Sequence, residues 1–172
     1  TLTCPCSVTA ASGVDALVHA IESYLSLNAS AITDSLAIGA IKLIVRALPK
    51  AYANPSNLQA REDMATASLM AGMAFGNAGV GAVHALAYPL GARYNIAHGV
   101  SNALLLPHVM HWNKMACFER MQDIAEAMGV KTAHLSVTQA ADKAVEVMTE
   151  LCAAVEIPSG LRSFGVPEEA IA

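Results

Sequence analysis

The sequence is poor in charge and in aromatic rings. Only 14% of its 172 residues are charged and 5% are aromatic, whereas 55% are hydrophobic. A disordered chain needs the opposite balance, so this composition excludes one. Ten Lys and Arg stand against fourteen Asp and Glu, and the basic residues form no cluster along the chain. A nucleic-acid surface needs a basic patch or stacking rings, so we expect no nucleic-acid partner.

Cysteine is also scarce, and its spacing excludes the common thiolate sites. Cys4, Cys6, Cys117 and Cys152 form no CxxC pair and no zinc-finger pattern. Cys4-Pro-Cys6 is too tight for an ordinary disulfide, and we expect two small buried or incidental thiols and a reducing, cytoplasmic location. The first six residues include no Met and no basic stretch. They are not typical of a signal peptide, and we expect them to lie within a longer chain.

Charged residues are missing altogether from the segment Met64–Ala92. Its length would suffice to cross a bilayer. However, the segment is rich in Ala and Gly, contains Pro89, and would be interrupted as a single helix by the glycines between Gly76 and Gly81. We therefore expect two buried helices joined by a Gly-rich turn, and no membrane partner. Close helix packing is expected at Gly72, Gly76, Gly79 and Gly81.

Helical periodicity dominates the chain, with no alternating strand pattern beyond the first six residues at most. Ser136 with Gln139 is typical of a capping box, Gly129 should end the preceding helix, and Pro49 and Pro107 should bend or end theirs. No repeat or low-complexity linker occurs, which predicts one all-α domain, a helical bundle, over residues 1–172. Helices are expected over residues 12–26, 33–48, 58–75, 80–90, 98 to beyond 105, 117–128 and 136–155, with another starting near 166.

Four polar side chains stand among apolar neighbours. Asp15 and His19 are four residues apart, which places them on one face of a helix. His84 lies in the uncharged segment, and His98 follows where a new helix should begin. A lone buried His is more often a hydrogen-bonded core residue, but two of them beside an Asp/His pair favour a metal, because a buried carboxylate needs a charged partner. Three imidazoles and one carboxylate suit Fe²⁺ or Zn²⁺ and can leave a position for a substrate oxygen.

The other histidines are expected to lie outside this site. We expect His108 to pack in the interior or to support the site, and His111 and His134 to be exposed. The glycines spell neither GxGxxG nor a Walker loop, so the chain carries no nucleotide-phosphate motif of its own.

Three segments surround the four candidate ligands. Residues 9–24 read TAASGVDALVHAIESY, residues 79–91 read GVGAVHALAYPLG, and residues 97–108 read AHGVSNALLLPH. Their order, spacing and flanking residues resemble the two metal-binding signatures of the iron-containing (group III) alcohol dehydrogenases. The similarity extends from about residue 1 to residues 165–169, so the resemblance covers nearly the whole chain.

The resemblance implies a fold and an organisation. The chain would correspond to the C-terminal helical domain of the dehydroquinate synthase-like, iron-type alcohol dehydrogenase fold. The family's N-terminal α/β domain, which holds NAD(P) through a Gly-rich turn, and its extreme C-terminus would both be missing from this chain. The full-length protein would be a homo-oligomer acting on a small alcohol or aldehyde, and this fragment alone would be inactive.

The resemblance also implies residue roles. Carried over by position, Asp15, His19, His84 and His98 would bind Fe²⁺ or Zn²⁺, and His98 would also lie near the nicotinamide as a catalytic residue. Many members have a His, with a suggested proton-relay role, where this chain has Tyr88. We therefore assign Tyr88 a catalytic role, with a cleft wall beside Pro89 as the alternative.

The implied reaction is NAD(P)-linked oxidation of an alcohol or reduction of an aldehyde. Two other interpretations stay open on the sequence. One is a non-redox or degenerate metal-binding helical domain. The other is a relative of the maleylacetate reductases or hydroxyacid dehydrogenases.

Overall fold

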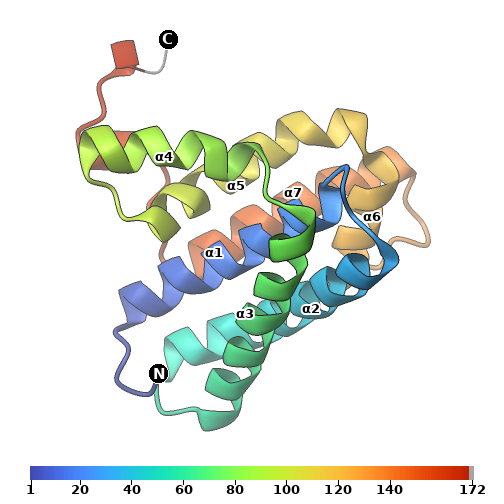
Figure 1. The fold of residues 1–172 in the computed structure, drawn as a ribbon, viewed down its shortest axis with the longest axis horizontal. Coiled ribbons are helices and arrows are strands. Elements are labelled where there is room, and N and C mark those ends of the chain that lie inside the picture. Colours follow the sequence, from blue (N-terminus) through green and yellow to red (C-terminus); the bar gives the residue numbers. More distant parts are fainter. Residues whose placement is uncertain (171–172) are drawn as a thin grey trace.

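The computed structural model describes residues 1–170, in which all regular structure is helical and no strand occurs (Figure 1). The all-α prediction is confirmed. The α-helices are α1 Cys6–Leu25, α2 Ala31–Ala53, α3 Leu58–Ala78, α4 Ala82–Tyr94, α5 His98–Asn113, α6 Phe118–Ala127 and α7 Val137–Ala154. Three short 3₁₀ turns follow or interrupt them: η1 Lys114–Ala116, η2 Leu161–Phe164 and η3 Glu168–Ala170.

Helix α1 is the central element of the bundle. It contacts α2 and α3 on one side and α5 on the other, and it runs through the middle of the view in Figure 1. Val14, Leu17, Val18 and Ile21 of α1 are fully buried and belong to the main hydrophobic cluster. A helix buried on several sides explains why its sequence is apolar nearly all round.

Two helices begin earlier than their sequences predict. Helix α1 begins at Cys6 rather than Ser12, because Ser12 Oγ donates to Val8 O inside the helix instead of capping it. Helix α2 begins at Ala31, after a capping box between Ser30 and Thr33. Thr33 is therefore the third residue of the helix and not its first.

Prolines inside the helices do not end them. Helix α2 continues through Pro49 to Ala53, and α4 and α5 likewise contain Pro89 and Pro107. A proline has no backbone N–H and so removes one helical hydrogen bond, but burial of the apolar residues before and after it stabilises the helix. Leu48 and Ala51 are both fully buried.

Local signals at other helix ends behave as expected. The capping box of Ser136 with Gln139 opens α7, and Gly129 adopts a φ of +94° after α6. The helix expected near residue 166 is only the turn η3, and the last two residues of the expected domain lie outside the described residues.

Close packing occurs at only one of the glycines expected, Gly81, where a Cβ would lie 2.8 Å from Glu22 Oε1. It also occurs at Gly13 and Gly99. A Cβ on Gly13 would lie 2.3 Å from Leu48 Cδ1, and one on Gly99 would lie 2.6 Å from the backbone oxygen of Ala11. These two glycines allow α2 and α5 to approach α1. Gly72 and Gly76 face open space, with nothing within 4 Å of an added Cβ, so the packing expectation is wrong for them.

Helices α3 and α4 form the expected pair with a glycine turn between them. Gly79 ends α3 with a φ of +82°, a conformation that glycine adopts without strain. No one helix of residues 1–170 is both long and apolar enough to cross a membrane; only α3 and α4 pass that test together, with a bend of 102°. Burial of the pair is only partial, because six large apolar side chains are exposed: Leu58, Leu69, Met73, Phe75, Leu86 and Tyr88.

Candidate metal centre

Three helices bring the candidate ligands to one place. Asp15 and His19 project from one face of α1, His84 comes from the first turn of α4, and His98 is the first residue of α5. The bend after α3 returns the chain to α1, and the Gly99 contact with Ala11 sets the start of α5 against α1. Ligand atoms of Asp15, His19 and His84 lie within 4.8 Å of one another.

His98 joins this group through the same carboxylate. Its Nε2 lies 3.7 Å from Asp15 Oδ1, and His84 Nε2 lies at the same 3.7 Å. His19 Nδ1 lies 3.8 Å from Asp15 Oδ2. These separations exceed hydrogen-bond length, whereas donors about 2.0–2.2 Å from a shared ion lie about 3–4 Å apart. The spacing of Asp15, His19 and His84 therefore suits a small cation, and His98 lies beside the carboxylate that they share.

One buried nitrogen in the group has no protein partner. His84 is 2% exposed, and its Nδ1 lies 2.7 Å from Glu22 Oε2. Its Nε2 is buried and makes no hydrogen bond. A buried polar atom left unpaired costs about 1–3 kcal/mol, and a metal ion at this position would satisfy it. The residues present therefore fit a divalent ion.

The charge of the site points the same way. Among residues 1–170, Asp15 and Glu22 form ion-pair contacts only with histidines, and no Lys or Arg approaches either carboxylate. Burial lowers the pKa of His19 below its ordinary 6.5, with Asp15 acting in the opposite direction. A neutral imidazole is the form that binds metals, and two carboxylates without a cationic side chain match the charge of a dication.

Aromatic rings line the site in a row. Phe75 stacks on His19 with ring centroids 4.4 Å apart, and His19 lies 4.3 Å from His84. His84 is 5.4 Å from His98, and the Tyr88 ring stacks 5.9 Å from His98. The side chain of His98 is 46% exposed and Tyr88 is 63% exposed. The expectation that His98 is buried in apolar surroundings is therefore wrong. Phe75 at the other end of the row is 36% exposed, so the buried His84 lies between two exposed ends.

Sequence reasoning missed two side chains at the site, Glu22 and Asn102. Glu22 is buried and contacts His84, while the Asn102 Nδ2 donates to Asp15 Oδ1 and lies 3.0 Å from His98 Nε2. Each lies on the helix face of a candidate ligand, since Glu22 follows His19 by three residues and Asn102 follows His98 by four. That spacing is the signal that could have found them.

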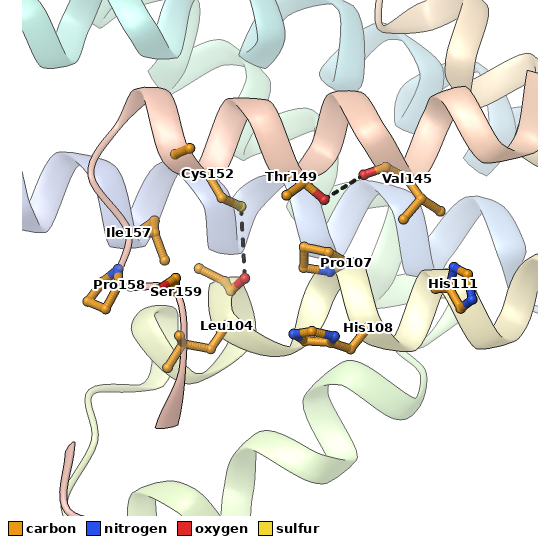
Figure 2. Close-up of a pocket in the computed structure, with 12 residues that line it drawn as sticks. Leu104, Pro107, His108, His111, Val145, Thr149, Cys152, Ile157, Pro158 and Ser159 are labelled. Atoms are coloured by element: carbon orange, nitrogen blue, oxygen red, sulfur yellow. Dashed lines mark hydrogen bonds between the residues drawn. The ribbon is translucent and has the colours of Figure 1, made fainter. Parts of the chain in front are cut away.

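The remaining histidines lie elsewhere. His111 and His134 are exposed, as expected. His108 is exposed as well and borders a groove between α5 and α7, so the expectation that it packs in the interior or supports the site is wrong (Figure 2). The groove has a volume of about 320 Å³, and none of the four candidate ligands lines it.

The sequence of this chain is similar to that of a known protein family over nearly its whole length. Residues 9–172 match the family model for the C-terminal part of the Fe-containing alcohol dehydrogenase family. The chain is 53% identical over 171 residues to long-chain-alcohol dehydrogenase 1 of Geobacillus thermodenitrificans (strain NG80-2). The aligned region covers 99% of this chain and 43% of that relative.

Two solved structures extend the comparison. A 1,3-propanediol oxidoreductase superposes with a TM-score of 0.97 at 51% identity, over 98% of this chain and 44% of that one. Sulfoacetaldehyde reductase from Bifidobacterium kashiwanohense, solved in complex with NAD⁺, superposes with a TM-score of 0.87 at 34% identity, over 99% and 43%. The chain thus spans less than half the length of these relatives. Since the family model matches nearly every residue, the chain belongs to the Fe-containing alcohol dehydrogenase family and corresponds to its C-terminal part.

Proposed function

We propose that this chain is the metal-binding half of an NAD(P)-linked alcohol dehydrogenase that acts on small alcohols and aldehydes. The observation that carries the proposal is the grouping of Asp15, His19, His84 and His98 around a buried, unpartnered His84 Nε2. The oxidoreductase names of the relatives support the reaction class, and they do not favour a non-redox metal-binding domain.

The four side chains would hold Fe²⁺, or Zn²⁺ as the alternative. The family description supports iron, and the mixture of three imidazoles with one carboxylate suits both ions. When bound, the ion would supply Lewis acidity toward the oxygen of an alcohol or aldehyde, and NAD(P) would supply the acceptor or donor of the hydride.

The side chains around the proposed ion would have different roles. Asp15 supplies the negative charge of the ligand set, and Phe75 stacks on the His19 ring and supports its orientation. His98 and Tyr88 lie at one exposed end of the row of rings, where substrate and nicotinamide would enter. Tyr88 could donate a hydrogen bond to the substrate oxygen, and a nicotinamide near His98 would be held by the part of the protein that the longer relatives contain.

Three further properties belong to the same proposal. We propose NAD(P) as the cofactor, supported by a similar reductase solved with NAD⁺. We also propose a homo-oligomer at full length, as the resemblance implies, and a reducing cytoplasmic location, supported by four free cysteines.

The test is metal analysis combined with NAD(H)-linked turnover of the full-length protein on a panel of primary alcohols. We expect about one ion per chain, and activity that a chelator removes and added Fe²⁺ or Zn²⁺ restores. His84→Ala should remove most of the metal and activity while leaving the helical circular dichroism nearly unchanged. Activity that survives complete removal of metal, or NAD(H) turnover by residues 1–172 alone, would contradict the proposal.

A further inference from the structure

Glu22 is a buried carboxylate that the proposed function does not use. It lies on α1 and is 4% exposed. Burying an ionised carboxylate costs several kcal/mol unless hydrogen bonds or a cation compensate it, and no Lys or Arg pairs with it in the described part of the chain. Its environment must therefore supply hydrogen-bond donors.

All three of its donors come from the start of α4. Glu22 Oε2 accepts from the Gly81 N–H at 2.8 Å, and Oε1 accepts from the Val83 N–H at 2.7 Å. The first N–H groups of a helix need acceptors, and the N-cap residue Gly81 has no side chain to provide one. Glu22 thus caps α4 from another helix, and its negative charge suits the positive end of the α4 dipole.

The third donor is His84 itself. When His84 Nδ1 donates to Glu22 Oε2, at 2.7 Å, its proton lies on that nitrogen and Nε2 keeps a free lone pair. That Nε2 is the unpartnered atom 3.7 Å from Asp15 Oδ1. The opposite tautomer would direct an N–H at the place where a metal ion would lie.

We propose that Glu22 is the positioning residue of the metal centre, because one carboxylate both fixes the start of α4 and holds His84 in its ligating tautomer. The proposal rests on the proposed function, since it assumes that His84 binds a metal. Hydrogen bonds from the outer nitrogen of a histidine ligand to a carboxylate typically change metal affinity by about 10- to 100-fold.

The contact between Glu22 and α4 also requires a residue without a side chain at position 81. The φ of Gly81, −123°, lies outside the left-handed region that favours glycine, so the space around the residue is the feature to consider. A Cβ at this position would lie 2.8 Å from Glu22 Oε1 and 3.2 Å from its Cδ. The carboxylate therefore reaches the helix end only because residue 81 has no side chain.

The decisive variant is Glu22→Gln, which keeps the shape but replaces one acceptor oxygen with an NH₂ donor. Glu22 Oε2 serves both Gly81 and His84, whereas Oε1 serves Val83, so the amide has two possible orientations. With the Gln oxygen at the Oε1 place, the NH₂ group faces His84 Nδ1 and the proton of His84 moves to Nε2. With the oxygen at the Oε2 place, the NH₂ group faces the Val83 N–H and the start of α4 loses an acceptor.

Because either orientation removes one of the two functions of Glu22, we expect Zn²⁺ affinity, measured by competition with a chelating dye, to fall by about 10- to 100-fold. In the metal-free chain, ¹H–¹⁵N spectra of the imidazoles identify the orientation, since only the first changes the tautomer of one histidine.

Glu62→Gln is the matched control, because Glu62 is exposed on α3. It should leave both the Zn²⁺ affinity and the tautomers unchanged. If Glu22→Gln loses its helical circular dichroism, Gly81→Ala decides, since it displaces Glu22 without altering any charge. Gly81→Ala should weaken Zn²⁺ binding by about 10-fold or more, and Gly72→Ala, whose added Cβ meets nothing within 4 Å, should not.

The outcomes separate this inference from the function beneath it. If the wild-type chain binds no Zn²⁺ or Fe²⁺, the proposed metal centre is wrong. If the wild type binds Zn²⁺ and a folded Glu22→Gln or Gly81→Ala variant binds it equally well, the centre stands and the role of Glu22 is wrong.

Discussion

Tyr88 stands where the family resemblance implies a histidine in many members, and its side chain is on the exposed side of the site. Its ring stacks on His98, 5.9 Å away, with most of its surface exposed. A phenol O–H can donate a hydrogen bond to a substrate oxygen. In the full-length enzyme we expect Tyr88→Phe to lower kcat by about 10-fold, within the range of a positioned acid–base group. A kcat within twofold of wild type would leave Tyr88 with only a stacking role.

Tyr24 allows a test of stability against pH. Its hydroxyl donates to Asp123 Oδ2, and Arg120 lies 4.3 Å above its ring. Burial, aided by Asp123, raises the pKa of Tyr24 from 10.0 to about 12. The folded state thus favours the neutral phenol, so this stabilisation is complete below pH 10 and is lost as pH rises from 10 through about 12.

Urea denaturation of Tyr24→Phe measures this effect. The variant should be about 1 kcal/mol less stable than wild type at pH 8, because one hydrogen bond is lost. The difference should shrink between pH 10 and 12. If the difference in unfolding free energy between Tyr24→Phe and wild type stayed constant from pH 10 to 12, the raised pKa of Tyr24 would be wrong.

Single residues also show how far a sequence predicts a site. The candidate ligands are recognisable because a carboxylate and imidazoles among apolar neighbours are unusual, and their spacing repeats a known pattern. Glu22 and Asn102 are marked only by their spacing from His19 and His98, and a polar residue on a helix usually faces solvent. Their burial depends on contacts far along the chain, of Glu22 with the start of α4 and of Asn102 with Asp15 of α1.

At the scale of helices, ends with a local cause are predictable and ends with a distant cause are not. Ser136 caps α7 with its own side chain, which the sequence displays. Helix α1 begins after Pro5 without any side-chain cap, and α4 is capped by Glu22 from another helix. No window of neighbouring residues contains those causes.

Two glycines in helix interiors should respond oppositely to alanine. Gly72→Ala should raise the free energy of unfolding by about 0.5–1 kcal/mol, because alanine restricts the unfolded chain and meets nothing in the folded one. Gly13→Ala should lower it by about 1–3 kcal/mol, because its Cβ would lie 2.3 Å from Leu48 Cδ1. Urea titrations of both variants provide the measurement. Equal signs would mean that packing against α2 does not require a glycine at residue 13.

The whole molecule presents apolar side chains around its site as well as in its core. Leu69, Met73, Leu86 and Tyr88 are each at least half exposed on α3 and α4. Exposed apolar side chains in such number typically mark an interaction surface. They lie on α3 and α4, the helices that carry Phe75 and His84 of the candidate metal centre, in a chain that spans less than half the length of its relatives.

A lysine substitution at Leu86 tests whether this exposed side chain contributes to the activity of the full-length protein without contributing to the stability of residues 1–172. Leu86→Lys should leave the stability of residues 1–172 within about 0.5 kcal/mol of wild type, because the side chain is already exposed. In the full-length enzyme the same change should lower kcat/KM by about 10-fold or more, if a second domain covers the residue. Lys42→Ala, on α2, is a control that should affect neither quantity. Unchanged activity of Leu86→Lys would show that residue 86 stays exposed to solvent in the full-length protein.

The pairing of Glu22 with His84 has a consequence for the order in which the protein assembles. The two residues are 62 positions apart, and His98 follows only after α4. During synthesis α1 leaves the ribosome several seconds before its partners exist, at about 5–20 residues per second. The long loop must close before any of these contacts forms, which places them late in folding. On the proposed function, a metal ion would therefore bind after these helices have packed, rather than nucleate the folding of the bundle.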